Sequence, residues 1–111
     1  MVANLAEAVD VSHRVHDFSN EEVRAALEPL LLGGELSAVA SEEAEAWLAA
    51  EIRGKSYDRN TCALSLADCF LLAHAITGGD EIATADPALA EVARSEGIGV
   101  IGLPDSAGAR P

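Results

Sequence analysis

The chain has 111 residues, of which half are hydrophobic and only 4% aromatic; seven Lys and Arg stand against nineteen Asp and Glu, giving a formal net charge of -12. This length and hydrophobicity suffice for one domain with a buried core and argue against a disordered chain. The negative charge argues against nucleic-acid binding through a broad basic patch, although a divalent cation can still bridge carboxylates to phosphate.

The first third of the chain predicts two helices and a short strand. Residues 4–16 repeat apolar side chains at helical spacing. Ser19, followed three residues later by Glu22, forms a capping box that opens a second helix. We expect that helix to weaken at Pro29 and to stop at the glycine pair after it, and we expect residues 35–40 to form a strand.

The middle of the chain predicts a third helix over residues 42–54. Ser41 is its expected cap and the glycine at its end is its expected stop. Trp47, Leu48 and Ile52 are expected to face inward. The acidic residues of this helix are interpreted as a solvated face.

The last part of the chain alternates helices with strands. The expected elements are a helix from residue 64 to 76, a strand over 80–85, a helix over 87–97 and a strand over 98–103, followed by a loose tail. Strands that alternate with helices predict an α/β fold with a parallel sheet. Only three short strands are counted, which is few for a sheet covered on both faces.

Nothing in the sequence indicates export or membrane insertion. The start "MVANLAEAVD" has no basic or apolar leader region, and no apolar stretch is long enough to span a membrane. Cys62 and Cys69 have no zinc-like spacing and are expected to be reduced core thiols. We therefore expect a cytoplasmic protein.

Asp68 is the one carboxylate inside the apolar run "LSLADCFLLAHAI" of residues 64–76. A buried, ionised aspartate without a partner is costly, so it needs a hydrogen-bonding cap, a counter-ion or a metal. One interpretation is a second capping box, in which Ser65 is the N-cap and Asp68 is the third helical residue. The other is a ligand site, because helix N-termini and strand ends meet at the binding edge of an α/β sheet.

Asp86 has the same two interpretations. It precedes Pro87 directly after the predicted strand, and Asp as N-cap with Pro at the first position is a common helix start. It also lies just past the carboxyl end of that strand, on the edge where Asp68 is expected. Thr84 adds a hydroxyl two residues earlier.

The segments "LSLADCFLLAHAI", "EIATADPALAEVA" and "GIGVIGL" resemble the second half of a PIN domain, and are most similar to the VapC-type toxin ribonucleases. In that family's pattern Asp68 matches the aspartate that opens a buried helix, and Thr84 and Asp86 match a T-x-D at a strand end. The segment "NLAEAVD" resembles the early helix with a glutamate, which places Glu7 at that position. Without the family, Glu7 is an ordinary solvated helix glutamate.

The resemblance implies a PIN-like three-layer α/β/α fold with a short parallel sheet, in one domain over residues 1–104, and a flexible tail over 105–111. It also implies a first strand ending in a further aspartate, which has no counterpart here, so the domain is expected to be N-terminally truncated. A missing central strand would leave sheet edges unpaired.

The chemistry that the resemblance implies is hydrolysis of RNA with Mg²⁺ or Mn²⁺. Asp68 and Asp86 would bind the metal most directly, Glu7 would act through water or position the nucleophile, and Thr84 would contact substrate phosphate. The implied partners are a cognate antitoxin and a second copy in a homodimer. Because one aspartate of the pattern is missing, activity is expected to be impaired; the alternative is a non-catalytic PIN remnant that only binds an antitoxin or dimerises.

The three histidines of the sequence are interpreted as structural residues rather than as ligands. His13 and His16 share a helix face, but no ligands at recognisable spacing accompany them, so they are interpreted as a polar helix end. His74 does not share a face with Asp68 and is interpreted as a satisfied histidine in the core or at its rim.

Overall fold

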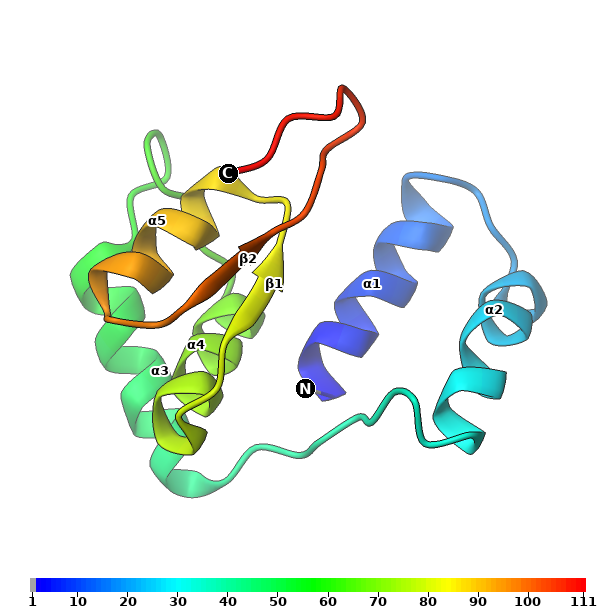
Figure 1. Ribbon diagram of the computed structural model, residues 1–111, viewed down its shortest axis with the longest axis horizontal. Helices are drawn as coiled ribbons and strands as arrows, with labels where there is room; N and C mark the ends of the chain where they lie inside the picture. Colours follow the sequence, from blue (N-terminus) through cyan, green and yellow to red (C-terminus); the bar gives the residue numbers. More distant parts are fainter. Residues whose placement is uncertain (1) are drawn as a thin grey trace. The chain divides into compact units, whose positions relative to one another are not determined.

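The structure is a computed structural model that describes residues 2–111, apart from the side chains of Val2, Ala3 and Glu7. The chain divides after Ser41 into two compact units. Figure 1 shows the N-terminal unit in blue to cyan and the C-terminal unit in green to red.

The N-terminal unit is a pair of helices, α1 (Val2–Arg14) and α2 (Asn20–Leu32). The predicted capping box at the start of α2 is confirmed, since the Glu22 amide donates to Ser19 Oγ at 3.2 Å and the Ser19 amide donates to Glu22 Oε1 at 3.3 Å. Pro29 lies inside α2, and the helix continues through it to the Gly33 cap. A proline near the C-terminal end removes one hydrogen bond without ending the helix.

The strand expected over residues 35–40 is absent from the structure, which describes this segment as irregular. The Leu36 amide in this segment donates a hydrogen bond to the Leu30 carbonyl of α2 at 3.1 Å. A strand forms only where a neighbouring strand takes up its backbone N–H and C=O groups. The prediction of a strand over residues 35–40 was therefore wrong.

The C-terminal unit begins with two packed helices, α3 (Glu43–Ser56) and α4 (Leu66–Gly78). α3 begins after Glu42 rather than Ser41 and runs through Gly54, which was the expected stop. α4 begins at the Ser65 cap, as predicted, and ends at Gly79, which has the left-handed φ of 67° that favours glycine.

A βαβ unit completes the C-terminal unit. Strand β1 (Ile82–Thr84) pairs in parallel with β2 (Val100–Gly102), and α5 (Pro87–Ser95) connects them. The parallel α/β arrangement is confirmed, but the sheet has two strands rather than the three expected. After β2, the Arg110 guanidinium donates to the Gly102 carbonyl at 2.7 Å and so ties the last residues to the strand.

The buried core lies in the C-terminal unit, and it is built by α3, α4, α5 and both ends of the βαβ unit. Its buried hydrophobic residues are Ala49, Ile52, Leu64, Cys69, Leu72, Ala73, Ala75, Ile82, Leu89, Val92, Ala93 and Ile98. No residue of α2 is buried. Among residues 2–111, no helix is long and apolar enough to cross a membrane.

The face that α3 turns to this core corrects two predictions. Trp47 was expected inward, yet its side chain is 74% exposed. Glu45 was assigned to a solvated face, yet it is only 4% exposed. Each residue advances about 100° around a helix, so a helix that buries Ala49 and Ile52 also buries Glu45 and turns Trp47 to the opposite side.

Candidate functional site

Asp68 lies in the first turn of α4, where the apolar helix meets its cap. Its amide donates to the Ser65 hydroxyl at 3.1 Å, which fixes the helix start. The side chain is half-buried, because the rest of α4 packs into the core through Cys69, Leu72 and Ala73. The capping interpretation of this segment is therefore confirmed at Ser65, and it places the Asp68 carboxylate at a helix N-terminus.

Burial raises the pKa of Asp68 above its ordinary value. Hydrogen bonds from the Ser65 hydroxyl and amide act in the opposite direction, and the charge of Asp86 raises the pKa further. The carboxylate is thus held in a place that favours its neutral form despite its hydrogen bonds. A cation at this position would relieve both the burial penalty and the repulsion from Asp86.

Asp86 caps α5 and is itself held from behind by Thr84. Its Oδ1 accepts a hydrogen bond from the Ala88 amide at 2.9 Å, with Pro87 at the first helical position, as predicted. The Asp86 amide donates to Thr84 Oγ1 at 3.0 Å. Thr84 is only 8% exposed at the end of β1, so its hydroxyl fixes the turn that presents the exposed Asp86 carboxylate.

The two aspartates reach the same edge of the C-terminal unit from different elements. α4 runs into β1, and α5 leaves β1, so their N-termini meet at the carboxyl end of that strand. The negative charge of Asp86 adds to burial in raising the pKa of Asp68. That Asp68 and Asp86 share one site, as the resemblance implies, stays a prediction.

Glu7 lies in α1, in the N-terminal unit, and its side chain is outside the described residues. The prediction that it joins Asp68 and Asp86 therefore stays a prediction. Among the side chains that the structure does describe, no group of three or more His, Cys, Asp or Glu is placed to hold a metal ion.

The carboxylates of Asp68, whose pKa is raised, and Asp86 are donors of the kind that a hard divalent cation prefers. Mg²⁺ commonly binds through one or two carboxylates and completes its octahedral shell with waters and substrate phosphate. Asp68 and Asp86 supply oxygen donors of this kind. The donor set suits Mg²⁺ or Mn²⁺ better than zinc.

Sequence reasoning missed a polar pair inside the C-terminal unit. The His74 Nδ1 atom of α4 lies 3.3 and 3.4 Å from the two carboxylate oxygens of Glu45 in α3. Only the longer contact, to Oε1, has hydrogen-bond geometry, so Glu45 Oε2 has no hydrogen-bond partner. His74 is thus a satisfied rim histidine, as predicted. The signal for Glu45 was its spacing from Ala49 and Ile52, which puts all three on one helix face.

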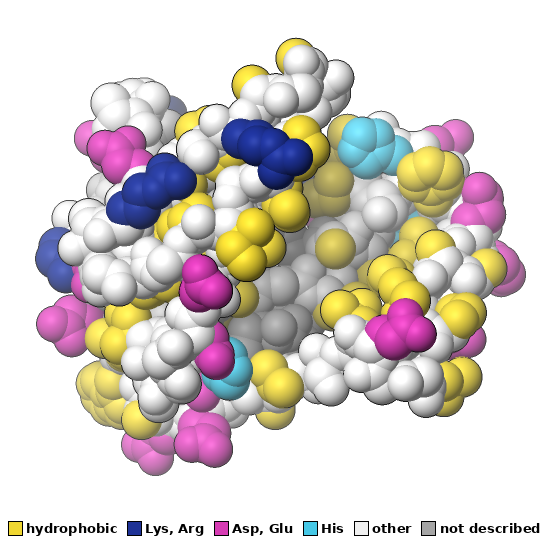
Figure 2. Space-filling model, in the orientation of Figure 1, with side chains coloured by type: hydrophobic (Ala, Val, Ile, Leu, Met, Phe, Trp, Pro, Cys, Tyr) yellow, Lys and Arg dark blue, Asp and Glu magenta, His cyan; other side chains and the backbone are white. Residues whose placement is uncertain are grey.

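Charge is unevenly distributed over the surface. Figure 2 shows acidic side chains on both units, whereas the Lys and Arg side chains on this face gather over the C-terminal unit. The C-terminal unit also carries the exposed apolar side chains of Trp47, Tyr57, Leu66 and Ile101. A broad basic surface for a nucleic-acid backbone is not visible on this face.

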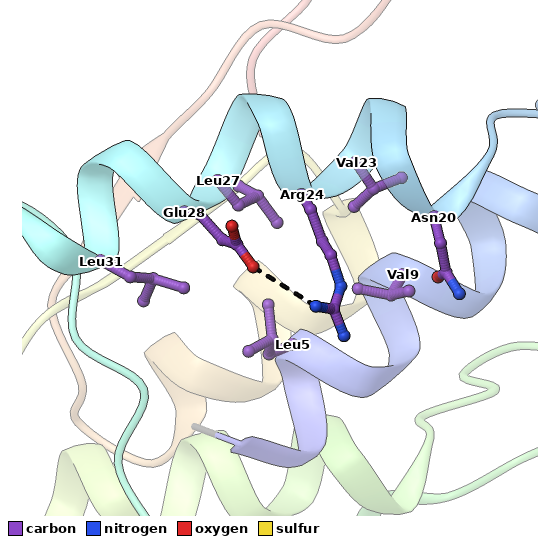
Figure 3. A pocket seen from close by; sticks show the side chains of 8 residues that line it. All are labelled: Leu5, Val9, Asn20, Val23, Arg24, Leu27, Glu28 and Leu31. Atoms are coloured by element: carbon purple, nitrogen blue, oxygen red, sulfur yellow. Dashed lines mark ion pairs between the residues drawn. The ribbon is translucent and has the colours of Figure 1, made fainter.

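An apolar groove follows the two helices of the N-terminal unit. It has a volume of about 290 Å³, and Figure 3 shows side chains of both helices pointing into it. The Arg24–Glu28 ion pair, 3.5 Å long, crosses its rim. Its apolar lining is Leu5, Val9, Val23, Leu27 and Leu31.

Comparison with known proteins gives a family match. The model of the family described as "PIN domain" matches residues 2–95, which is most of the chain and includes Glu7, Asp68, Thr84 and Asp86. No curated protein and no solved structure matches significantly.

Proposed function

Because this chain belongs to the PIN-domain family, whose members are nuclease-type and generally depend on a divalent metal, we propose that it is a metal-dependent endoribonuclease of the VapC-like toxin–antitoxin type. The observation that supports this proposal most directly is that Asp68 and Asp86 lie at the N-termini of α4 and α5, and that the charge of Asp86 adds to burial in raising the pKa of Asp68. Structural capping explains each aspartate alone, but it does not require two carboxylates to repel each other.

The proposal gives each residue of the site a role. A bound Mg²⁺ or Mn²⁺ would supply an activated water and offset charge on the phosphoryl group. Asp68 and Asp86 would hold the ion through their carboxylate oxygens, and Glu7 would hold or orient a water. Thr84 fixes the Asp86 turn through its hydroxyl, and its role toward substrate phosphate is proposed from the resemblance.

The acidic surface of the protein would limit the affinity for an RNA substrate. The chain carries a net charge of -12, so the phosphate backbone is repelled at long range. Affinity would then depend on the cation between the aspartates and the phosphate. With three assigned carboxylates where the family's pattern has a fourth, we propose that turnover by these 111 residues is weak.

The test is cleavage of a structured RNA with and without Mg²⁺ by the chain and by Asp68→Asn. We expect slow cleavage that requires the metal and is lost in the variant by about 100-fold or more, because one ligand of the ion is removed. Asp80→Asn, which changes an exposed carboxylate elsewhere in the same unit, is the matched control and should cleave normally. Cleavage that survives Asp68→Asn or metal removal would sink the proposal.

A second candidate function is a non-catalytic module that binds a cognate antitoxin. It is favoured by the apolar grooves of the N-terminal unit, because α1 and α2 bury none of their described side chains fully. A larger groove of about 400 Å³ is lined by Ala8, Ser12, Phe18, Glu22, Val23, Ala26 and Leu27. Members of the family often pair with antitoxins. Partner binding that persists in Asp68→Asn, together with no RNA cleavage by the unchanged chain, would favour this candidate.

A further inference from the structure

The segment that follows β2 is folded into a turn by its own hydrogen bonds. Asp105 Oδ1 accepts from the amide of Ala107 at 2.8 Å and from the amide of Ala109 at 2.9 Å. The Asp105 amide donates to the Ala109 carbonyl at 2.8 Å, and the Gly108 amide donates to the Asp105 carbonyl at 3.0 Å. An aspartate that accepts from the backbone just after it gives residues 105–109 a defined shape.

Two arginines tie this segment to the βαβ unit. Figure 1 shows it in red, leaving β2 and turning back toward α5. Arg110 Nη1 donates to the carbonyl of Gly102, at the end of β2, at 2.7 Å. Arg94, in the last turn of α5, donates from Nη2 to the Pro111 carbonyl at 3.1 Å. Residues 103–111, the strap, are therefore fixed to both β2 and α5.

The strap lies directly against Gly102, where the backbone leaves no room for a side chain. A Cβ at Gly102 would lie 2.9 Å from the Pro111 carbonyl oxygen and 3.5 Å from Arg110 Cβ. Gly102 pairs with Thr84 in the parallel register of the two strands. The strap therefore packs on the position of β2 that lies opposite Thr84.

Hydrogen bonds continue from this position to Asp86. The Leu103 amide donates to the Thr84 carbonyl at 2.8 Å, and Thr84 Oγ1 accepts from the Asp86 amide at 3.0 Å. Asp86 caps α5, and the last turn of the same helix carries Arg94. The contacts thus form a closed ring, in which the strap joins the end of α5 to the strands that hold its beginning.

We propose that the strap fixes the Asp86 turn, and that Arg110 is a positioning residue of the proposed metal site. Groups behind a metal ligand hold its orientation, and their loss weakens metal binding even though they do not touch the ion. The inference rests on the proposed function for the role of Asp86 as a ligand. The hold of the strap on the Asp86 turn does not depend on that role.

Protection of the sheet edge is a simpler role for the strap. The Leu103 amide points toward β1, and backbone groups alternate in direction along a strand, so the Gly102 carbonyl points to the outer edge of β2. Arg110 covers the edge at this carbonyl, which limits pairing with another chain. Edge protection alone predicts no change at Asp86 when the strap is released, so experiment can separate the two roles.

Two variants release the strap by different means. Arg110→Gln removes the guanidinium, and Gly102→Ala places a methyl group against the Pro111 carbonyl oxygen without a change of charge. The matched controls are Arg59→Gln, at an exposed arginine of the same unit, and Gly54→Ala, where a Cβ meets nothing within 4 Å. Circular dichroism of each variant checks that the helices are retained.

The first measurement is hydrogen exchange of the Asp86 and Leu103 amides by NMR in the full chain. Both strap variants should exchange faster at these amides by about 10-fold, since loss of one hydrogen bond makes local opening easier by that order. Both control variants should exchange at the rate of the unchanged chain.

The second measurement is the affinity for Mn²⁺, followed by the electron paramagnetic resonance of the free ion. Arg110→Gln and Gly102→Ala should each weaken binding by about 10-fold, as loss of a hydrogen bond behind a metal ligand does. Loss of a positive charge alone acts in the opposite direction, because a more acidic protein attracts a cation more strongly, and Arg59→Gln measures that effect. Arg110→Lys keeps the charge and a donor, and should bind Mn²⁺ more tightly than Arg110→Gln.

Unchanged exchange at Asp86 in both strap variants would overturn the proposal. Faster exchange with unchanged or tighter Mn²⁺ binding would overturn the positioning role and leave edge protection. If the unchanged chain binds no Mn²⁺, or if Asp68→Asn binds it equally well, the proposed metal site fails, and with it the role of Asp86 as a ligand. Exchange at Asp86 then still decides whether the strap holds the turn, so the two proposals fail on different measurements.

Discussion

At the scale of single residues, Asp68 links stability to the proposed chemistry. Burial raises the pKa of its carboxyl in the folded state, with a further contribution from Asp86. The folded protein therefore binds more protons than the unfolded chain between the ordinary pKa and the raised one, and stability falls as pH rises through that window. At neutral pH the ionised Asp68 destabilises the fold.

The resulting prediction is that Asp68→Asn stabilises the protein at neutral pH. The amide keeps the shape of the side chain and carries no charge to bury. Urea unfolding should show a higher free energy of unfolding for the variant at pH 7, and the advantage should vanish below the ordinary carboxyl pKa. Equal stability at pH 7, or a lower value for the variant, would contradict it. Asp80→Asn, at an exposed position, is the control.

At the scale of the elements, two glycines near the C-terminal ends of helices differ in backbone conformation. Gly79 ends α4 with a left-handed φ of 67°, whereas Gly54 lies inside α3 and a Cβ there meets nothing within 4 Å. Alanine is a better helix former than glycine but is strained in the left-handed region. The same substitution should therefore act in opposite directions.

Gly54→Ala is expected to raise the free energy of unfolding by about 1 kcal/mol, and Gly79→Ala to lower it by about 1 kcal/mol. Chemical denaturation at low micromolar concentration measures both without a contribution from association. A stabilising Gly79→Ala would show that the left-handed end of α4 is not retained in solution.

Local sequence signals determine some elements of the fold, whereas others depend on residues that are distant in the sequence. Ser65, Gly79 and the Asp86–Pro87 pair are caps whose chemistry acts within a few residues, so α4 and α5 were predicted with nearly correct ends. The strand over 35–40 and the burial of Glu45 depend on distant partners. Trp47 was misplaced because hydrophobicity was given more weight than the spacing of the buried residues around it.

The candidate site likewise contains residues that local sequence signals predict and residues that they do not. The places of Asp68 and Asp86 at helix N-termini were predicted from local signals and are confirmed, whereas their joint role in a site stays a prediction. The place of Glu7 rests on family resemblance alone, because a glutamate on a helix carries no local signal that separates a ligand from a solvated side chain. The Glu45–His74 contact required the packing of α3 on α4 and could not be read from either helix alone.

At the scale of the whole molecule, the buried residues are concentrated in one of the two units. All hydrophobic residues of the core lie between Ala49 and Ile98, and the described residues of α1 and α2 are at most half-buried. Because burial of apolar surface is the main favourable term in folding, the two units should differ strongly in autonomous stability.

We therefore predict that a fragment of residues 42–111 unfolds cooperatively on its own, whereas a fragment of residues 1–41 is largely unfolded. Two short helices without a buried core are marginal in water. Circular dichroism with thermal unfolding of both fragments makes the comparison, with the full chain as reference. Loss of all cooperative unfolding in the longer fragment would show that its core depends on the first 41 residues.

Asp86 caps α5 and Asp68 lies in the first turn of α4, so a substitution at either position changes both a helix N-terminus and a negative charge. Asp86→Ala removes the acceptor for the Ala88 amide and weakens the start of α5, so a loss of the proposed activity in this variant does not separate helix fraying from loss of the proposed ligand. Asparagine retains the acceptor and discards only the ionic charge. Asp86→Asn therefore separates the effect of the charge from the effect on the helix cap, whereas Asp86→Ala does not.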